Sequence, residues 1–213
     1  MVSEKTLEIN FVRNFQHSYH FVWQGATLRE EAGPGGGWDV RVDKLASGKS
    51  FIVQFKRPYS IKKSNDCKCF TFYINNNTHH DQNQLLSDLA QSFDTPTVFY
   101  AFPCVEEMSQ LAKPREEILW RTALADVKQT NLVNLGGKTQ HKIEIDLCPD
   151  RHGRYTFSGK VYSEQKKIDL MTVSEYKTWG FELNGSEKRN FKVKEELKSK
   201  RLQINFFTKV SQL

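Results

Sequence analysis

Six consecutive residues, Phe51-Ile52-Val53-Gln54-Phe55-Lys56, constrain the fold of this chain more than any other segment. Their apolar character predicts a strand packed in a hydrophobic core. Because alternate side chains of a strand share a face, Gln54 and Lys56 should point one way while Val53 and Phe55 point into apolar packing. A buried ammonium is costly unless it is paired, so Lys56 needs a partner there. A site for a metal ion and a phosphate group would supply one.

An acidic residue stands at the start of the preceding strand, in Gly37-Trp38-Asp39-Val40. The turn Ala46-Ser47-Gly48-Lys49 separates this strand from the next, which predicts a hairpin. The hairpin would bring the carboxylate of Asp39, the amide oxygen of Gln54 and the ammonium of Lys56 near one another.

This arrangement resembles the PD-(D/E)xK, or restriction-endonuclease-like, superfamily, in the branch that carries Gln in place of the acid before the lysine. The matching segments are Gly37-Trp38-Asp39 and Val53-Gln54-Phe55-Lys56, extended upstream by Leu28-Arg29-Glu30-Glu31 and downstream by His79-His80-Asp81-Gln82-Asn83-Gln84-Leu85-Leu86. The resemblance covers roughly residues 28–102. It implies an α/β fold whose core has a central mixed sheet flanked by helices, built from a helix, three strands, a helix and a strand.

The periodicity of the first half is compatible with that order. It predicts helices over residues 3–16 and 81–92, and strands over 40–45, 51–56, 70–75 and 97–102. In the second half we expect a helix that starts near Pro114 and carries Ile118, Leu119, Ala123 and Leu124. A hairpin over 143–157, a capping box at 172–175 and a strand over 202–206 follow. The predicted organisation is a nuclease-like core over 1–104 and a C-terminal α+β extension over 105–213, packed on that core.

The resemblance also implies roles for individual residues. Asp39 would ligate Mg²⁺ or Mn²⁺, which prefer oxygen ligands, and Gln54 would offer its side-chain oxygen. Lys56 would lie against the attacking water or the scissile phosphate. Glu31 is the candidate for a second carboxylate, and the sequence leaves Glu30 and Glu8 open as alternatives.

The function implied is a metal-dependent nuclease that acts on DNA in preference to RNA, in bacterial or phage defence or in DNA processing. The rival is a catalytically inactive nuclease-like module that binds nucleic acid or a protein partner, since the neutral Gln54 weakens the metal site. The chain has no phosphate-binding loop of the Gly-x-x-x-x-Gly-Lys-Ser/Thr type, no Gly-x-Gly-x-x-Gly after a strand and no Gly-x-Ser-x-Gly elbow. Nucleotide-driven and serine-hydrolase chemistry are therefore set aside.

Positive charge is unevenly distributed along the chain, whose net charge is +6. Residues 111–213 hold 20 Lys and Arg against 13 Asp and Glu, whereas residues 1–110 hold 11 against 12. A basic cluster over 188–201 is either a solvated face or a phosphate-contacting surface. The candidates for nucleic-acid contact are Arg57, Lys62, Lys63, Lys192 and Lys194.

The chain lacks any apolar run near the roughly 20 residues that span a bilayer, and its start shows no signal-peptide pattern. We therefore expect a cytoplasmic protein without a membrane partner, and a homodimer or a protein partner stays open. The four cysteines are expected to be free thiols, in preference to a metal site made by Cys67, Cys69, His79 and His80.

Overall fold

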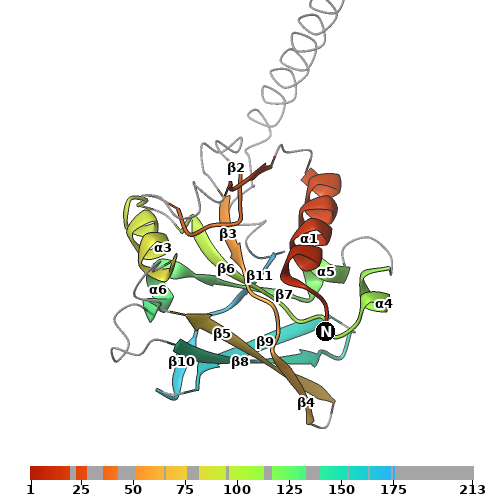
Figure 1. Cartoon of the computed structure of the whole chain (residues 1–213). Helices are drawn as coiled ribbons and strands as arrows, with labels where there is room; N and C mark the ends of the chain where they lie inside the picture. The colour runs from red at the N-terminus through yellow and green to blue at the C-terminus, as the bar shows by residue number, and fades with distance from the viewer. Residues whose placement is uncertain are drawn as a thin grey trace, which may run out of the picture.

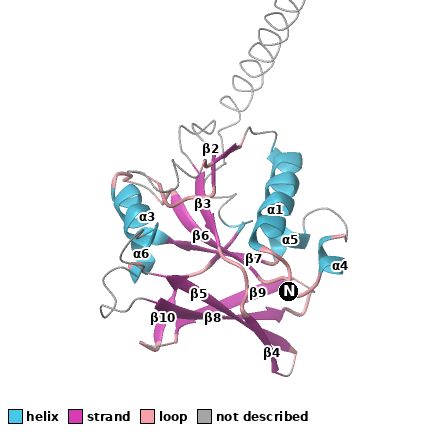
Figure 2. Cartoon of the chain, in the orientation of Figure 1, coloured by secondary structure: helices cyan, strands magenta, loops and turns pink. Residues whose placement is uncertain are grey.

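The computed structural model describes residues 1–19, 23–27, 36–42, 51–64, 66–75, 82–94, 96–112, 117–132, 140–152, 154–162, 164–173 and 175. Two β-sheets and several helices make up these residues (Figures 1 and 2). The helices are α1 (Glu4–Tyr19), α3 (Gln82–Gln91), α4 (Met108–Leu111), α5 (Glu117–Trp120) and α6 (Val127–Thr130).

The first sheet has the strand order β1-β2-β3-β6-β7-β11. Its strands are β1 (Gln24–Gly25), β2 (Val40–Val42), β3 (Phe51–Phe55), β6 (Val98–Pro103), β7 (Thr122–Asp126) and β11 (Met171–Thr172). The β3–β6 pair is parallel and the other pairs are antiparallel, so the sheet is mixed.

Helix α1 covers one face of this sheet. The Ser3 hydroxyl accepts a hydrogen bond from the Thr6 N–H at 3.2 Å, which satisfies one of the unpaired donors at the start of the helix. Leu7, Phe11 and Phe15, spaced by four residues, are fully buried against this face. On the sheet side the cluster contains Phe51, Val53, Phe55, Phe99, Ala101 and Leu124. This packing confirms the predicted direction of Val53 and Phe55.

A second sheet, together with α3, covers the opposite face. Its strand order is β10-β9-β8-β5-β4, all antiparallel. The strands are β4 (Ser60–Ser64), β5 (Cys67–Asn75), β8 (Gln140–Pro149), β9 (Tyr155–Val161) and β10 (Lys166–Ile168). One apolar cluster joins both sheets to α3 through Ile52, Tyr100 and Phe102 of the first sheet, Phe70, Phe72, Ile143 and Ile145 of the second, and Leu86 and Ala90 of α3. The layers are therefore α1, the first sheet, and then α3 with the second sheet.

Most of the predicted elements occur within one to four residues of their expected bounds. The structure confirms the mixed α/β class, both early helices, both strands of the 40–56 hairpin and the strand before Pro103. The hairpin over 143–157 is present as β8 and β9. Thr172 and Glu175 exchange the two capping-box hydrogen bonds, at 2.5 and 3.0 Å. The predicted strand over 202–206 lies outside the described residues.

Three expectations differ from the structure. Ala123 and Leu124 lie in strand β7 and not in a helix, which ends at Trp120. The expected third strand of the core, residues 70–75, belongs to the second sheet. Cys67 and Cys148 form a disulfide across β5 and β8, so only Cys69 and Cys104 are free thiols.

Strands from both sides of residue 104 contribute to each sheet. In the first sheet β6 pairs with β7, and in the second β5 pairs with β8. A boundary at 104 would thus cut through both sheets. Among the residues that the structure describes, no helix is both long enough and apolar enough to cross a membrane.

Candidate functional site

Asp39 lies one residue before β2, at the end of β3 that carries Gln54. Its backbone N–H donates to the Val53 carbonyl at 2.9 Å, and its carboxylate Oδ2 accepts the Phe55 N–H at 2.6 Å. Two hydrogen bonds to the backbone of β3 therefore hold Asp39, and the one from Phe55 orients its carboxylate.

Burial raises the pKa of Asp39 to about 7, and the Phe55 N–H acts in the opposite direction. The charge of Glu4 raises this pKa further, Lys56 lowers it, and Glu8 raises it. Three carboxylates and one ammonium are thus close enough to influence one another. The excess of negative charge disfavours ionisation of Asp39 unless a cation is present.

The two glutamates come from the first turns of α1. Glu4 Oε2 accepts the backbone N–H of Arg57 at 3.1 Å, which joins the start of the helix to the chain just after β3. The side chain of Glu8 is largely buried, and its Oε1 lies 2.6 Å from the Nζ of Lys5. Helix α1 therefore presents two acids to the end of β3, where Asp39 is held.

Gln54 is a polar residue inside the core, with 1% of its surface exposed. Its Nε2 has no hydrogen-bond partner among the described residues. In the parallel register Gln54 lies opposite Tyr100, whose hydroxyl donates to Asn83 of α3. A buried amide group without a partner is destabilising, so a polar atom in this position calls for a functional explanation.

Lys56 follows β3 directly and reaches toward α3. Its Nζ lies 3.4 Å from Oε1 of Gln82, and its backbone N–H donates to the Ala101 carbonyl at 2.9 Å. The start of α3 approaches closely at Gly37, which has φ of +83°, and a Cβ there would lie 2.5 Å from the Gln82 carbonyl oxygen. Glycine at this position therefore lets α3 bring Gln82 up to the site.

Lys56 and Glu8 are both near enough to Asp39 to act on its pKa, and Gln54 lies in the adjoining core. α1 and α3 flank them from opposite sides of β3 (Figure 1). Glu31 and Glu30 lie outside the described residues. The sequence interpretation missed Glu4, although its spacing of four from Glu8 places both on one helix face, which was a usable signal.

The residues expected to contact nucleic acid are dispersed. Arg57 is exposed directly after Lys56, whereas Lys62 and Lys63 are exposed on β4, an edge strand of the second sheet. Lys192 and Lys194 lie outside the described residues.

No family model, curated protein or solved structure matches this chain.

The side chains around Asp39 decide whether a metal ion could bind at the candidate site. Within the described ranges, no three His, Cys, Asp or Glu side chains gather in a way that could hold a metal. A cation at this site would accordingly depend on Asp39, on Glu8 and on the amide oxygen of Gln54. These are oxygen donors of the kind that Mg²⁺ and Mn²⁺ accept, and the crowding of negative charge around Asp39 favours a cation.

Proposed function

We propose that this protein is a metal-dependent nuclease that hydrolyses phosphodiester bonds in DNA. The observation that carries the proposal is the convergence of an ammonium, Lys56, with a carboxylate, Asp39, that is buried and surrounded by further acids. A carboxyl group whose pKa is raised to about 7 chiefly by burial, with an ammonium close enough to act on it, is a candidate for a functional site. Phosphodiester hydrolysis uses a carboxylate to hold a metal ion and an ammonium to stabilise the charge on the phosphate.

The order of elements supports the same proposal. The first sheet and its helices follow the order α1, β1, β2, β3, α3 and β6, while β4 and β5 depart to the second sheet. The first sheet matches the implied order of a helix, three strands, a helix and a strand when the two-residue β1 takes the place of the expected strand over 70–75, which belongs to the second sheet. The candidate residues fall on α1, before β2 and at the end of β3.

In the proposed reaction each residue of the candidate site has its own role. Asp39, held by the Phe55 N–H, would be the main ligand of Mg²⁺ or Mn²⁺. Glu8 would approach it from the α1 face of β3, and Gln54 would offer its amide oxygen from the opposite face, that of α3. The metal would supply Lewis-acid relief of charge on the phosphate and a bound water of lowered pKa. Lys56, oriented by Gln82, would donate to the phosphate oxygens or to the attacking water.

Cleavage assays with matched variants test this proposal. The full chain is incubated with plasmid and with single-stranded DNA, in Mg²⁺, in Mn²⁺ and in chelator. Lys56→Ala and Asp39→Ala should each lower metal-dependent cleavage by at least about a hundredfold, the scale of losing a group that acts in the transition state. Lys167→Ala and Asp169→Ala, at exposed positions on and beside β10, are the controls and should retain activity.

Loss of activity in the controls, or unchanged turnover in either site variant, would contradict the assignment. DNA binding without cleavage under every metal condition would favour the inactive module. As a separate test of the ligand, Gln54→Glu should tighten Mn²⁺ binding measured by calorimetry, because it adds a charge to the site. Unchanged affinity would remove Gln54 from the ligand set.

A further inference from the structure

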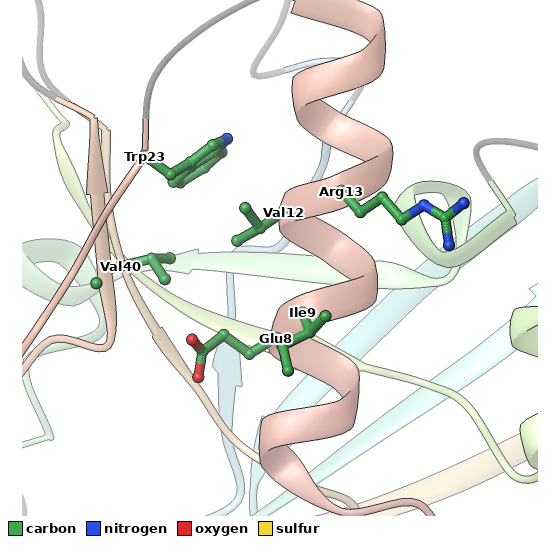
Figure 3. A pocket seen from close by; sticks show the side chains of 7 residues that line it. Glu8, Ile9, Val12, Arg13, Trp23 and Val40 are labelled. Carbon is green, nitrogen blue, oxygen red and sulfur yellow. The ribbon is translucent and has the colours of Figure 1, made fainter. Parts of the chain in front are cut away.

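A pocket of about 320 Å³ lies beside the candidate site, between α1 and strands β1 and β2 (Figure 3). Its lining residues are Glu8, Ile9, Val12, Arg13, Trp23, Gly25 and Val40. Trp23, Val12 and Val40 turn toward one another, and Glu8 extends from α1 toward the strand that carries Val40 (Figure 3). The volume lies at the lower end of the range for small-molecule sites, roughly 300–1,000 Å³.

This pocket shares Glu8 with the candidate site and adjoins it at Val40. Glu8 lines the pocket and also acts on the pKa of Asp39, while Val40 follows Asp39 in the chain. A group that entered the pocket would therefore lie next to the carboxylates proposed to act on a phosphate.

Four apolar side chains, those of Ile9, Val12, Trp23 and Val40, line the pocket beside Glu8 and Arg13. The Trp23 ring is held by edge contacts with Phe11, Phe15 and Phe51, at centroid distances of 6.4, 5.1 and 5.7 Å. Such a ring, with valine side chains nearby, suits a flat group with an apolar face. A nucleobase is a flat group of this kind, and every base has a face that stacks on aromatic residues.

The positive charge of Arg13, one of the lining residues, also suits a nucleotide. Arg13 is exposed, makes no ion pair within the described part of the chain, and points away from the other lining side chains (Figure 3). A guanidinium in this position can contact the backbone phosphate of a neighbouring nucleotide while the base occupies the apolar part.

We infer that this pocket receives one base of the strand to be cut, so that the substrate is DNA with an unpaired nucleotide at the scissile phosphate. The inference rests on the proposed nuclease function. A base inside a duplex is stacked and paired, and it can enter a pocket between a helix and a sheet only after leaving the stack. Single strands and frayed ends are therefore the substrate class, and intact duplex is not.

Gly25 provides a way to fill the pocket without disturbing the fold. It pairs with Val40 in the antiparallel register, so a side chain at position 25 would share the pocket-facing side with Val40. A Cβ at Gly25 would meet no atom within 4 Å. The series Gly25→Ala, Gly25→Val and Gly25→Leu therefore adds increasing volume, and thermal unfolding of each variant shows whether it folds.

Binding is measured by fluorescence anisotropy in chelator, with a labelled oligothymidylate and an abasic oligomer of equal length. The wild-type chain should bind the oligothymidylate roughly tenfold more tightly, the scale of one stacked base. Gly25→Leu should abolish this preference and Gly25→Ala should retain it. Arg13→Gln should weaken both oligomers equally, with Arg151→Gln, at the exposed turn between β8 and β9, as its control.

Cleavage of the same oligothymidylate in Mg²⁺ separates this inference from the proposed function. A base preference that Gly25→Leu removes, without cleavage by any form, would support the pocket and overturn the nuclease. Cleavage that Gly25→Leu leaves unchanged, with equal affinity for both oligomers, would overturn the pocket and leave the nuclease standing.

Discussion

At the scale of single residues, the alternation of a strand accounts for much of the candidate site. Val53 and Phe55 are fully buried against α1, and Lys56 reaches α3, as the pattern of β3 predicts. The same pattern does not reveal that Gln54 is almost completely buried, because burial depends on the second sheet and α3, which are distant in the sequence. The raised pKa of Asp39 likewise depends chiefly on burial, and also on the charges of Glu4 and Glu8, more than 30 residues away.

This raised pKa makes the stability of the metal-free protein depend on pH. Between 3.8, the ordinary value, and about 7, folded Asp39 keeps a proton that the unfolded chain has released. The free energy of unfolding should therefore fall as pH rises through this window, with a slope of at most about 1.4 kcal/mol per pH unit for one proton. Above about pH 7 this contribution is lost and the dependence on Asp39 ends.

Urea unfolding in chelator, at a series of pH values, measures the effect. Asp39→Asn should flatten the slope in this window, whereas Asp169→Asn, at an exposed position, should leave it unchanged. Identical slopes in the wild type and Asp39→Asn would mean that Asp39 titrates normally in the folded protein.

At the scale of elements, the sequence predicts strongly periodic segments well and fails where local preference and packing disagree. Ala123, Leu124 and Ala125 are good helix formers, yet they form β7 because antiparallel pairing with β6 buries all three. Strand β4, with the polar sequence SIKKS, gave no signal of its own and is an edge strand paired to β5. Both β7 and β4 are strands because of their pairing with other strands and not because of their local sequence.

The disulfide between β5 and β8 provides a test at this scale. Cys67 and Cys148 lie opposite one another with their Cα atoms 4.4 Å apart, and the bond closes a chain segment of 81 residues. On the chain-entropy account, Cys67→Ser should lower the free energy of unfolding by about 2–4 kcal/mol. Cys69→Ser, at a free thiol on the same strand, is the control.

Thiol titration of the denatured, non-reduced protein checks the pairing directly. Two reactive thiols, those of Cys69 and Cys104, are expected, and four would show that the disulfide is absent. In that case Cys67→Ser and a reducing agent should both leave the unfolding midpoint unchanged.

At the scale of the whole molecule, the layered arrangement of two sheets is beyond what the sequence alone predicts. The periodicity identifies β5 and β8 as strands, but not that they pair with each other away from the first sheet. The chain's net charge, by contrast, is readable from sequence. Its positive excess lies in residues 111–213, whereas Glu4, Glu8 and Asp39 make the candidate site acidic.

A polyanion that reaches an acidic site needs positive charge elsewhere, which the basic cluster over 188–201 can supply. DNA affinity should therefore fall steeply with salt, with a log–log slope of roughly 0.9 per phosphate neutralised on duplex DNA and roughly 0.7 on a single strand. Reversing Lys192 and Lys194 to Glu should reduce that slope, whereas reversing Arg151 and Lys167 should not. Anisotropy titrations across a salt series give the slopes, and equal slopes in all forms would assign the cluster to a solvated surface.

The backbone changes sheets immediately after Lys56. The Lys56 N–H bonds to Ala101 in the first sheet, and three residues later the Tyr59 N–H bonds to Thr71 in the second. Lys56 thus lies at one of the points where the chain passes from the first sheet to the second. On the proposed nuclease function, substitutions in the interface between the sheets are expected to shift this ammonium relative to Asp39 and so to change the rate of cleavage.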